Sequence, residues 1–320
     1  MLIYTLRRLS LLFFTLLILS LLAYGMDRHI DSDSSINLIN GYFEFVKNFL
    51  QGQWGISSVT GEPVLNSVLA YLPATLGLAL AAIFLATVIG ITLGMLAALY
   101  RDHWPDMIIT NLSLLGFSIP IYWLATLLVM TLAMQLGWFP SAGQLSLLYQ
   151  IPPVTGFSLL DCWLSDKPYR MAALWDALQH LILPACVLGL ITTTEVIRLV
   201  RSSLSEVMGQ SYIKAALSRG RSTWSVVLTH GLRNALPPIL PMMSMQFGTI
   251  VTSAIITEQM FEWPGLGRWL VSSINARDFA AVLACMLVIA ITLIVINVFS
   301  ELLTVLFYPA KRKAMYAQQG

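Results

Sequence analysis

Lysine, histidine and cysteine are the residues of this chain best suited to chemistry, and their spacing excludes several reactions. A Walker A loop, which cradles nucleotide phosphates, needs glycine followed by lysine and then serine or threonine. None of the five lysines follows a glycine. The four histidines form no H-x-x-x-H or H-E-x-x-H pair, and Cys162, Cys186 and Cys285 are too far apart for a metal site or a disulfide framework. We therefore expect no catalytic residue, no cofactor and no metal site.

The polar stretch 211–241 is strongly basic. It contains Lys214, Arg219, Arg221, His230 and Arg233 and no acidic residue. In a membrane protein, any loop that remains in the cytoplasm collects Lys and Arg, so the composition alone is typical of an ordinary cytoplasmic loop. The alternative is a surface that another protein binds.

The same stretch predicts two short helices. Residues 212–219 favour a helix, and Gly220 follows at the position where a helix can end in a left-handed residue. A second helix is expected over 224–234, and Pro237 and Pro238 after it suit the first turn of a further helix. Two short helices hinged at a glycine would form a surface suited to binding a partner.

A second distinctive stretch, F-E-W-P-G-L-G-R-W-L, occupies residues 261–270. It contains a Pro-Gly turn between Trp263 and Trp269, whose rings favour the membrane–water interface. We expect an interfacial turn in which Gly265 and Gly267 adopt backbone angles that a Cβ atom disfavours.

The composition identifies the chain as a polytopic membrane protein. Hydrophobic residues make up 57% and charged residues 11% of its 320 residues, and the mean hydropathy is +0.77. A soluble domain carries about twice that share of charge. The six predicted spans are 9–24, 72–100, 107–135, 181–200, 238–257 and 280–307. A short aromatic run at 41–50 predicts an interfacial helix.

Several residues inside the spans suggest particular roles. Pro73 is expected near the start of the second span, where Gly90 and Gly94 would let another helix approach closely. Pro120 should bend the third span, either as a packing kink or as a gating element. The spans contain no aspartate and no metal-binding pair, which argues against an intramembrane hydrolase.

Glu195 and Arg198 are three residues apart near the cytoplasmic end of the fourth span. The simpler interpretation is an ion pair between them or with a neighbouring helix. The alternative is that Glu195 pairs with a basic residue of the loop, since charges inside a membrane are often functional.

The distribution of Lys and Arg predicts the orientation. Twelve of these residues fall on the side that carries both termini and the basic loop, and six fall on the other side. Both termini should therefore be cytoplasmic, with the turn at 261–270 outside.

Both distinctive stretches resemble the permeases of ATP-binding-cassette (ABC) importers, in the dipeptide and oligopeptide branch. The K-A-A sequence with Gly220 four residues on, followed by L-R-N-A-L-P-P, resembles the family's EAA motif, although Lys214 stands where Glu is usual. The pattern T-E-x-x-F-x-W-P-G-L-G-R matches at residues 257–268. Residues 154–166 and 192–201 are most similar to the B-type permease subunit of Sap-type peptide transport systems.

The resemblance implies an all-α, six-helix membrane protein with the type I ABC importer permease fold. Residues 1–70 would hold the first helix and an external segment, 71–307 the permease core with a cytoplasmic coupling loop at 202–234, and 308–320 a cytoplasmic tail. The first apolar run could also be a cleaved signal peptide, but the family begins with a similar retained helix.

The resemblance also implies which residues matter. The expected coupling-loop residues are Tyr212, Lys214, Ala215, Ala216, Gly220, Leu232, Arg233, Asn234 and Pro237. The expected residues of the external turn are Glu258, Trp263, Pro264, Gly265, Gly267 and Arg268.

The function implied by the resemblance is peptide transport, including antimicrobial peptides, across a bacterial inner membrane by alternating access. The partners would be a homologous second permease subunit, two ATP-binding subunits and a periplasmic substrate-binding protein. One alternative within the family is export of the polyamine putrescine. An alternative of another class is an ATP-independent carrier or channel. A carrier of this kind should show paired broken helices and buried coupling charges.

Overall fold

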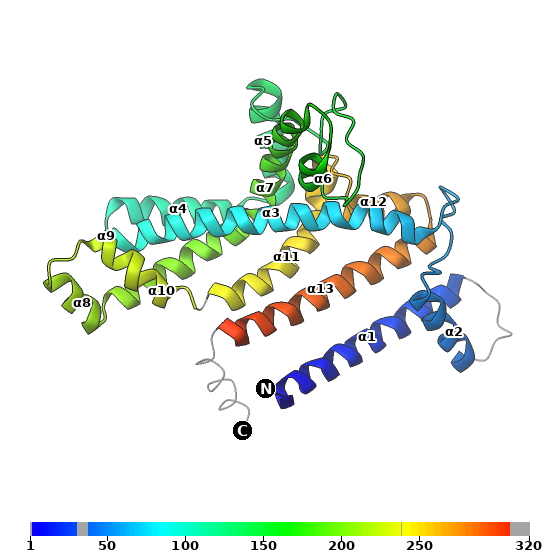
Figure 1. Cartoon of the computed structure of the whole chain (residues 1–320), viewed down its shortest axis with the longest axis horizontal. Helices are drawn as coiled ribbons and strands as arrows, with labels where there is room; N and C mark the ends of the chain where they lie inside the picture. The colour runs from blue at the N-terminus through cyan, green and yellow to red at the C-terminus, as the bar shows by residue number, and fades with distance from the viewer. Residues whose placement is uncertain (1, 31–37, 238, 308–320) are drawn as a thin grey trace. The chain divides into compact units, whose positions relative to one another are not determined.

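The computed structural model of the protein describes residues 2–30, 38–237 and 239–307, and the named elements in these ranges are all helices (Figure 1). The first are α1 (Leu2–Ile30), α2 (Leu38–Leu50), α3 (Val64–Leu99), α4 (Trp104–Ser118), α5 (Ile121–Leu128) and the π-helix η1 (Val129–Gln135). Next come α6 (Ser158–Leu164), α7 (Arg170–Met208), α8 (Ser211–Ser218), α9 (Thr223–Val226), the π-helix η2 (Val227–Gly231) and α10 (Leu232–Ala235). The last are α11 (Ile239–Met260), α12 (Leu266–Asn275) and α13 (Phe279–Phe307).

The helices form two compact units that interleave along the chain. Unit 1 comprises Met1–Gly77, Trp138–Leu181 and Ala254–Val298, and unit 2 comprises Leu78–Gly137, Ile182–Ser253 and Phe299–Gly320. The turn at 261–270, named the external turn after its expected side, belongs to unit 1, and the basic loop belongs to unit 2.

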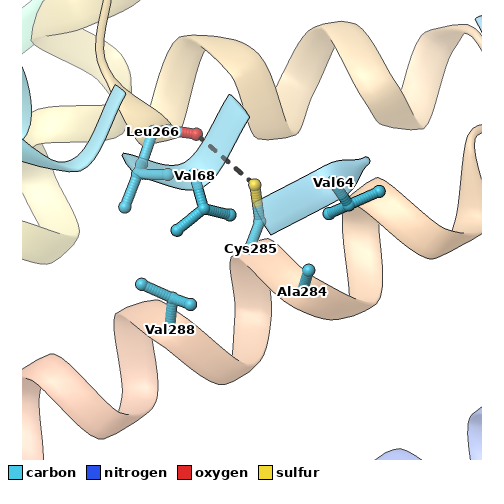
Figure 2. Packing of buried hydrophobic residues seen from close by; sticks show 6 residues of the cluster. All are labelled: Val64, Val68, Leu266, Ala284, Cys285 and Val288. Carbon is cyan, nitrogen blue, oxygen red and sulfur yellow. Dashed lines mark hydrogen bonds between the residues drawn. The ribbon is translucent and has the colours of Figure 1, made fainter. Parts of the chain in front are cut away.

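A core cluster in unit 1 explains why α3 begins earlier than expected. Val64 and Val68, in the first two turns of α3, pack with Leu266 of α12 and with Cys285 and Val288 of α13 (Figure 2). This burial extends the helix well beyond the hydrophobic run. The expectation that Pro73 lies near a helix start is therefore wrong, because Pro73 lies inside α3.

Small residues bring α3 and α7 together in unit 2. A Cβ atom on Gly90 would lie 2.6 Å from the Val196 side chain, and one on Gly94 would lie 2.9 Å from the carbonyl oxygen of Ile197. The close helix approach predicted from the spacing of these two glycines is confirmed.

The predicted bend at Pro120 is confirmed, and it is large. α4 ends at Ser118, α5 begins at Ile121, and the axes of the two segments differ by 105°. Pro120 occupies the N-cap position of α5, where its missing N–H costs nothing. Whether this bend gates a path stays a prediction.

Three helices in the described residues are long and apolar enough to cross a membrane, within Val64–Leu99, Arg170–Met208 and Phe279–Phe299. The bent pair Trp104–Ser118 with Ile121–Gln135 makes a fourth if it counts as one span. The apolar part of α1, Phe13–Met26, is shorter. The polytopic all-α class is thus confirmed, and the number six stays a prediction.

Glu195 makes a different contact from either one expected. The side-chain amide of Gln246 on α11 donates a hydrogen bond of 2.5 Å to Glu195 Oε2, while Arg198 is exposed. No ion pair joins Glu195 to a basic residue within the described part of the chain. A neutral partner on another helix satisfies the carboxylate, which sequence spacing along α7 could not indicate.

Replacing Gly94 with leucine should destabilise unit 2. The new side chain would collide with the Ile197 carbonyl oxygen and the Val200 side chain, and overpacking of this kind costs about 1–3 kcal/mol. Thermal unfolding of the purified protein in detergent should show a lower midpoint for Gly94→Leu. Gly25→Leu is the matched control, since a Cβ atom at Gly25 has nothing within 4 Å. Equal midpoints for the two variants would contradict the packing role of Gly94.

Candidate functional site

The first half of the basic loop is a short helix that ends at a left-handed glycine. Helix α8 runs from Ser211 to Ser218, and Gly220 has a φ angle of +80°. The Gly220 amide donates a hydrogen bond of 2.9 Å to the carbonyl oxygen of Leu217, which closes the turn. A residue with a Cβ atom is strained at this φ angle even though the space around Gly220 is open. The chain therefore reverses at Gly220 because glycine tolerates this conformation.

The second half of the loop is helical but not one regular helix. A π-helical segment, Val227–Gly231, separates α9 from α10, where a single helix over 224–234 was expected. A Cβ atom at Gly231 would lie 2.9 Å from the Leu204 side chain of α7. The hydroxyl of Ser203 on α7 donates to the carbonyl oxygen of Ala235 at 2.9 Å. Packing on α7 thus accompanies a helical geometry that local sequence does not reveal.

Within the described residues, helix α11 starts at Ile239, and Pro237 is part of a turn. Pro237 therefore lies outside the next helix, and Pro238 falls outside the described residues.

Buried apolar residues anchor the loop, and the predicted coupling-loop residues are exposed or half-buried. Ile213, Val226 and Val227 are fully buried, and the side-chain amide of Asn234 donates a 3.1 Å hydrogen bond to the hydroxyl of Tyr212. The exposed predicted residues are Tyr212, Lys214, Ala215, Gly220, Arg233 and Asn234, and the half-buried ones are Ala216, Leu232 and Pro237.

Sequence reasoning missed two residues on this surface. Trp224 in α9 is 47% exposed and Leu228 in η2 is 58% exposed. Large apolar residues within a basic loop are a signal that could have identified them, because exposed apolar side chains often mark a protein-binding surface.

An ion pair at the start of α4 was also missed. Asp106 is 2% exposed, and Arg201 of α7 binds it through Nε at 2.5 Å and Nη2 at 2.7 Å. The Asp102 amide adds a hydrogen bond of 2.9 Å. Bidentate Arg–carboxylate contacts of this kind fix geometry. The pair joins α4 to α7 just before the basic loop begins.

In unit 1, a buried carboxylate organises the external turn. Glu258, at the end of α11, has no exposed surface. The hydroxyl of Thr75 on α3 donates to Glu258 Oε1 at 2.6 Å and accepts a hydrogen bond of 2.8 Å from the Leu266 amide. The Arg268 amide donates to Glu258 Oε2 at 3.0 Å. One carboxylate therefore joins α3, α11 and the first turn of α12.

This arrangement satisfies the N-terminus of α12. The N-cap residue, Gly265, has no side chain to cap the helix, and the first amides of a helix lack partners inside it. Thr75 and Glu258 supply the missing acceptors, and a carboxylate near a helix N-terminus is favourable. The cap thus comes from residues distant in the sequence.

The expected reason for glycine at 265 and 267 is wrong. Gly265 has φ −110° and ψ 175°, an extended conformation open to any residue, and Gly267 has no positive φ angle. The real constraint is space, because a Cβ atom at Gly265 would collide with the Glu258 carboxylate and one at Gly267 would lie 2.7 Å from Ile255 Cα.

The Trp263 ring is buried inside the protein. It is 2% exposed, and its ring N–H donates to the carbonyl oxygen of Ala74 at 3.0 Å. Pro264 beside it is half-buried. Trp269, also half-buried, stacks on Tyr71 with ring centroids 5.4 Å apart. Both tryptophans therefore attach the turn to α3, and the position of the turn at the membrane–water interface stays a prediction.

Arg268 clamps the exposed side of the turn. Its Nη1 donates to the Glu262 carbonyl oxygen at 2.7 Å, and its Nη2 lies 3.6 Å from Glu262 Oε2. Within residues 2–30, 38–237 and 239–307, no group of three or more His, Cys, Asp or Glu residues could hold a metal ion. The two sites therefore consist of a fastened turn and an exposed helical surface.

The chain is similar to known transport proteins over nearly its whole length. The family model described as binding-protein-dependent transport system inner membrane component matches residues 90–313. The chain is 42% identical to the peptide transport system permease protein SapB of Salmonella typhimurium over 99% of both chains. It is 41% identical to the putrescine export system permease protein SapB of Escherichia coli, again over 99% of both.

A further relative and a solved structure extend the comparison. The di/tripeptide transport system permease protein DppB of Pseudomonas aeruginosa is 41% identical over 86% of this chain and 81% of that protein. An inward-facing structure of the MetNI methionine ABC transporter matches with a TM-score of 0.54 at 16% identity, over 76% of this chain and 97% of that one. The structural match shows a shared fold.

Removing the Glu258 carboxylate should destabilise unit 1 strongly. Glu258→Ala leaves the Thr75 hydroxyl and the Arg268 amide without their acceptor, and an unsatisfied buried polar group costs about 1–3 kcal/mol. Glu262→Ala is the matched control four residues away, because the Glu262 side chain is 65% exposed. Thermal unfolding in detergent should give a clearly lower midpoint for Glu258→Ala only. A midpoint as low for Glu262→Ala would show that the buried network is not the cause.

Proposed function

We propose that this chain carries peptides across a bacterial inner membrane, since it belongs to the family of binding-protein-dependent transport system inner membrane components. It acts as a permease subunit of an ABC transporter, with ATP hydrolysed by separate subunits. The similarity to peptide permeases over 99% of the chain supports this role. The sequence contains no Walker A loop, which agrees with a division of labour between subunits.

The observation that carries the proposal is the surface at the hinge of the basic loop. Tyr212, Trp224 and Leu228 expose large apolar side chains, while Ile213, Val226 and Val227 hold the same segments to unit 2 by burial. Exposed aromatic anchors on a supported scaffold are typical of protein-binding surfaces. This surface is where the ATP-binding subunits would engage the permease.

The partners of the complex follow from the family. An ABC transporter permease works with ATP-binding subunits and a substrate-binding protein. The specific set that we propose is a homologous second permease subunit, two ATP-binding subunits and a periplasmic binding protein. Alternating access would follow when movement of the ATP-binding subunits displaces the loop at 202–234.

Peptide is the favoured substrate, and putrescine is the second candidate. Relatives in Salmonella typhimurium, Pseudomonas aeruginosa and Escherichia coli O157:H7 carry peptide-transport names, whereas the relative in Escherichia coli strain K12 carries a putrescine-export name. ATPase activity of the reconstituted complex should rise with di- and tripeptides in the presence of the binding protein. A rise with putrescine and none with peptides would overturn the peptide assignment.

Orientation in the membrane is a separate proposal that rests on the twelve-to-six distribution of Lys and Arg. A cysteine at the fully exposed Leu147 should react with an impermeant thiol reagent added to intact cells, and one at the exposed Thr223 should not. Both changes are made in a Cys186→Ala background to remove a half-buried native thiol. Labelling of Thr223→Cys in intact cells would show that the orientation is the opposite of the one proposed.

Two substitutions in the loop should separate coupling from folding. Ala216→Trp adds bulk to the surface of α8, and Gly220→Glu strains the left-handed turn by about 1–3 kcal/mol. Both variants should reach the membrane at normal levels but lose recovery of the ATP-binding subunits in pull-downs. Transport should fall in parallel with that recovery.

Arg221→Gln is the control for these variants. Arg221 is exposed, and an exposed charge contributes little to binding, so its neutralisation should leave recovery nearly unchanged. Undiminished recovery of the ATP-binding subunits with both Ala216→Trp and Gly220→Glu would mean that the loop is an ordinary basic cytoplasmic loop.

A further inference from the structure

Unit 2 contains an open groove that the transport role does not explain. Helices α3, α4 and α7 enclose a volume of about 330 Å³. Its floor consists of small residues, Ala86 on α3 and Ala185 and Gly189 on α7. A Cβ atom at Gly189 would lie 2.8 Å from the carbonyl oxygen of Ala82, so the helix backbones already touch at the floor. The groove is therefore a consequence of close helix packing.

The polar groups that line the groove are already satisfied. The Ser113 hydroxyl donates to the Thr110 carbonyl oxygen, and the Thr193 hydroxyl donates to that of Gly189. The Thr194 hydroxyl donates to the carbonyl oxygen of Ser113 at 3.1 Å. No strong hydrogen-bond donor in the lining is left for a ligand, so the occupant must be apolar over this length.

The dimensions of the groove match one leaflet of a bilayer. Along α7 the lining extends from Ala185 to Ile197, which corresponds to about 18 Å at 1.5 Å per residue. Half of the hydrocarbon core of a bilayer is about 15 Å thick. Helices α3 and α7 are both long and apolar enough to cross a membrane. The groove is thus long enough for one lipid acyl chain.

One end of the groove carries positive charge. Arg198 follows the lining residue Ile197 and lies four residues after Thr194. Its side chain is exposed and forms no ion pair within the described part of the chain. The neighbouring Arg201 is neutralised by Asp106. Arg198 is therefore available for an anion at the polar end of the groove.

The geometry points to a site for an anionic phospholipid, with one acyl chain in the groove of α3, α4 and α7 and its phosphate at Arg198. An apolar channel that ends at an unpaired cation fits a molecule with one long apolar tail and one negative head. This site does not depend on the identity of the transported substrate.

The first test counts the lipid that the protein retains. The full-length protein is reconstituted in vesicles of equal phosphatidylglycerol and phosphatidylethanolamine, extracted in detergent and measured by native mass spectrometry. One phosphatidylglycerol should remain bound per chain. Arg198→Gln should lower its retention about fivefold, the effect of one basic residue on an anionic lipid. Lys47→Gln, which removes an exposed charge in unit 1, should have no effect.

A second pair of variants tests the tail. Cys186→Phe fills the groove from α7 and should abolish retention, whereas Val88→Phe changes an exposed residue of α3 outside the lining and should preserve it. Equal retention in these two variants would place the lipid elsewhere and overturn the proposal. So would equal retention of both lipids by the wild-type protein.

The wild-type thiol provides a test that does not depend on folding of a variant. Cys186 lines the groove and is half-buried, while Cys162 and Cys285 are buried. Cys186 should be protected from a small maleimide when phosphatidylglycerol is bound and should react after detergent has stripped the lipid. Reaction at equal rates in both states would mean an empty groove. Protection in both states would mean that protein covers it, and either result overturns the proposal.

Discussion

A carboxylate buried among apolar helices needs hydrogen-bond donors inside the chain, and one such carboxylate organises each unit. In unit 1 the Glu258 carboxylate receives hydrogen bonds from Thr75 and the Arg268 amide. In unit 2 the Asp106 carboxylate receives two from Arg201. Each carboxylate joins helices that are distant in the sequence. Removing either partner would leave a buried polar group without compensation, which is why such networks define a single arrangement.

The glycines serve two different purposes. Gly220 provides a left-handed turn at an exposed hinge, with nothing near its missing side chain. Gly265 leaves room for the Glu258 carboxylate, and Gly94 leaves room for a neighbouring helix. The first purpose is a property of the local backbone, and the second depends on what lies opposite. The movement that we propose for transport is therefore placed at the Gly220 hinge, while packing holds the external turn in position.

This difference explains how much of the structure could be predicted. The all-helical class, the bend at Pro120 and the turn at Gly220 follow from local sequence, and the structure has them. The role of Gly265 could not be read from its neighbours, because Glu258 reaches it only through the fold. The same holds for Trp263, which donates to Ala74 across the core of unit 1.

The candidate sites were likewise predictable only in part. The motif residues of the loop and turn were identified by resemblance, but their surroundings were not. The Asp106–Arg201 pair required the tertiary structure, because contacts between helices have no fixed spacing in the sequence. The π-helical segment before Leu232 likewise accompanies packing on α7, since Gly231 lies against Leu204.

We propose that this chain is a permease whose transport is driven by ATP through the loop hinged at Gly220. The most direct test is uptake of a labelled dipeptide into vesicles that hold the assembled complex, with binding protein on one side and ATP on the other. We expect uptake that requires ATP and that is lost in Gly220→Glu at an unchanged level of folded permease. Uptake that proceeds equally without ATP, or that is unaffected by Gly220→Glu, would contradict it.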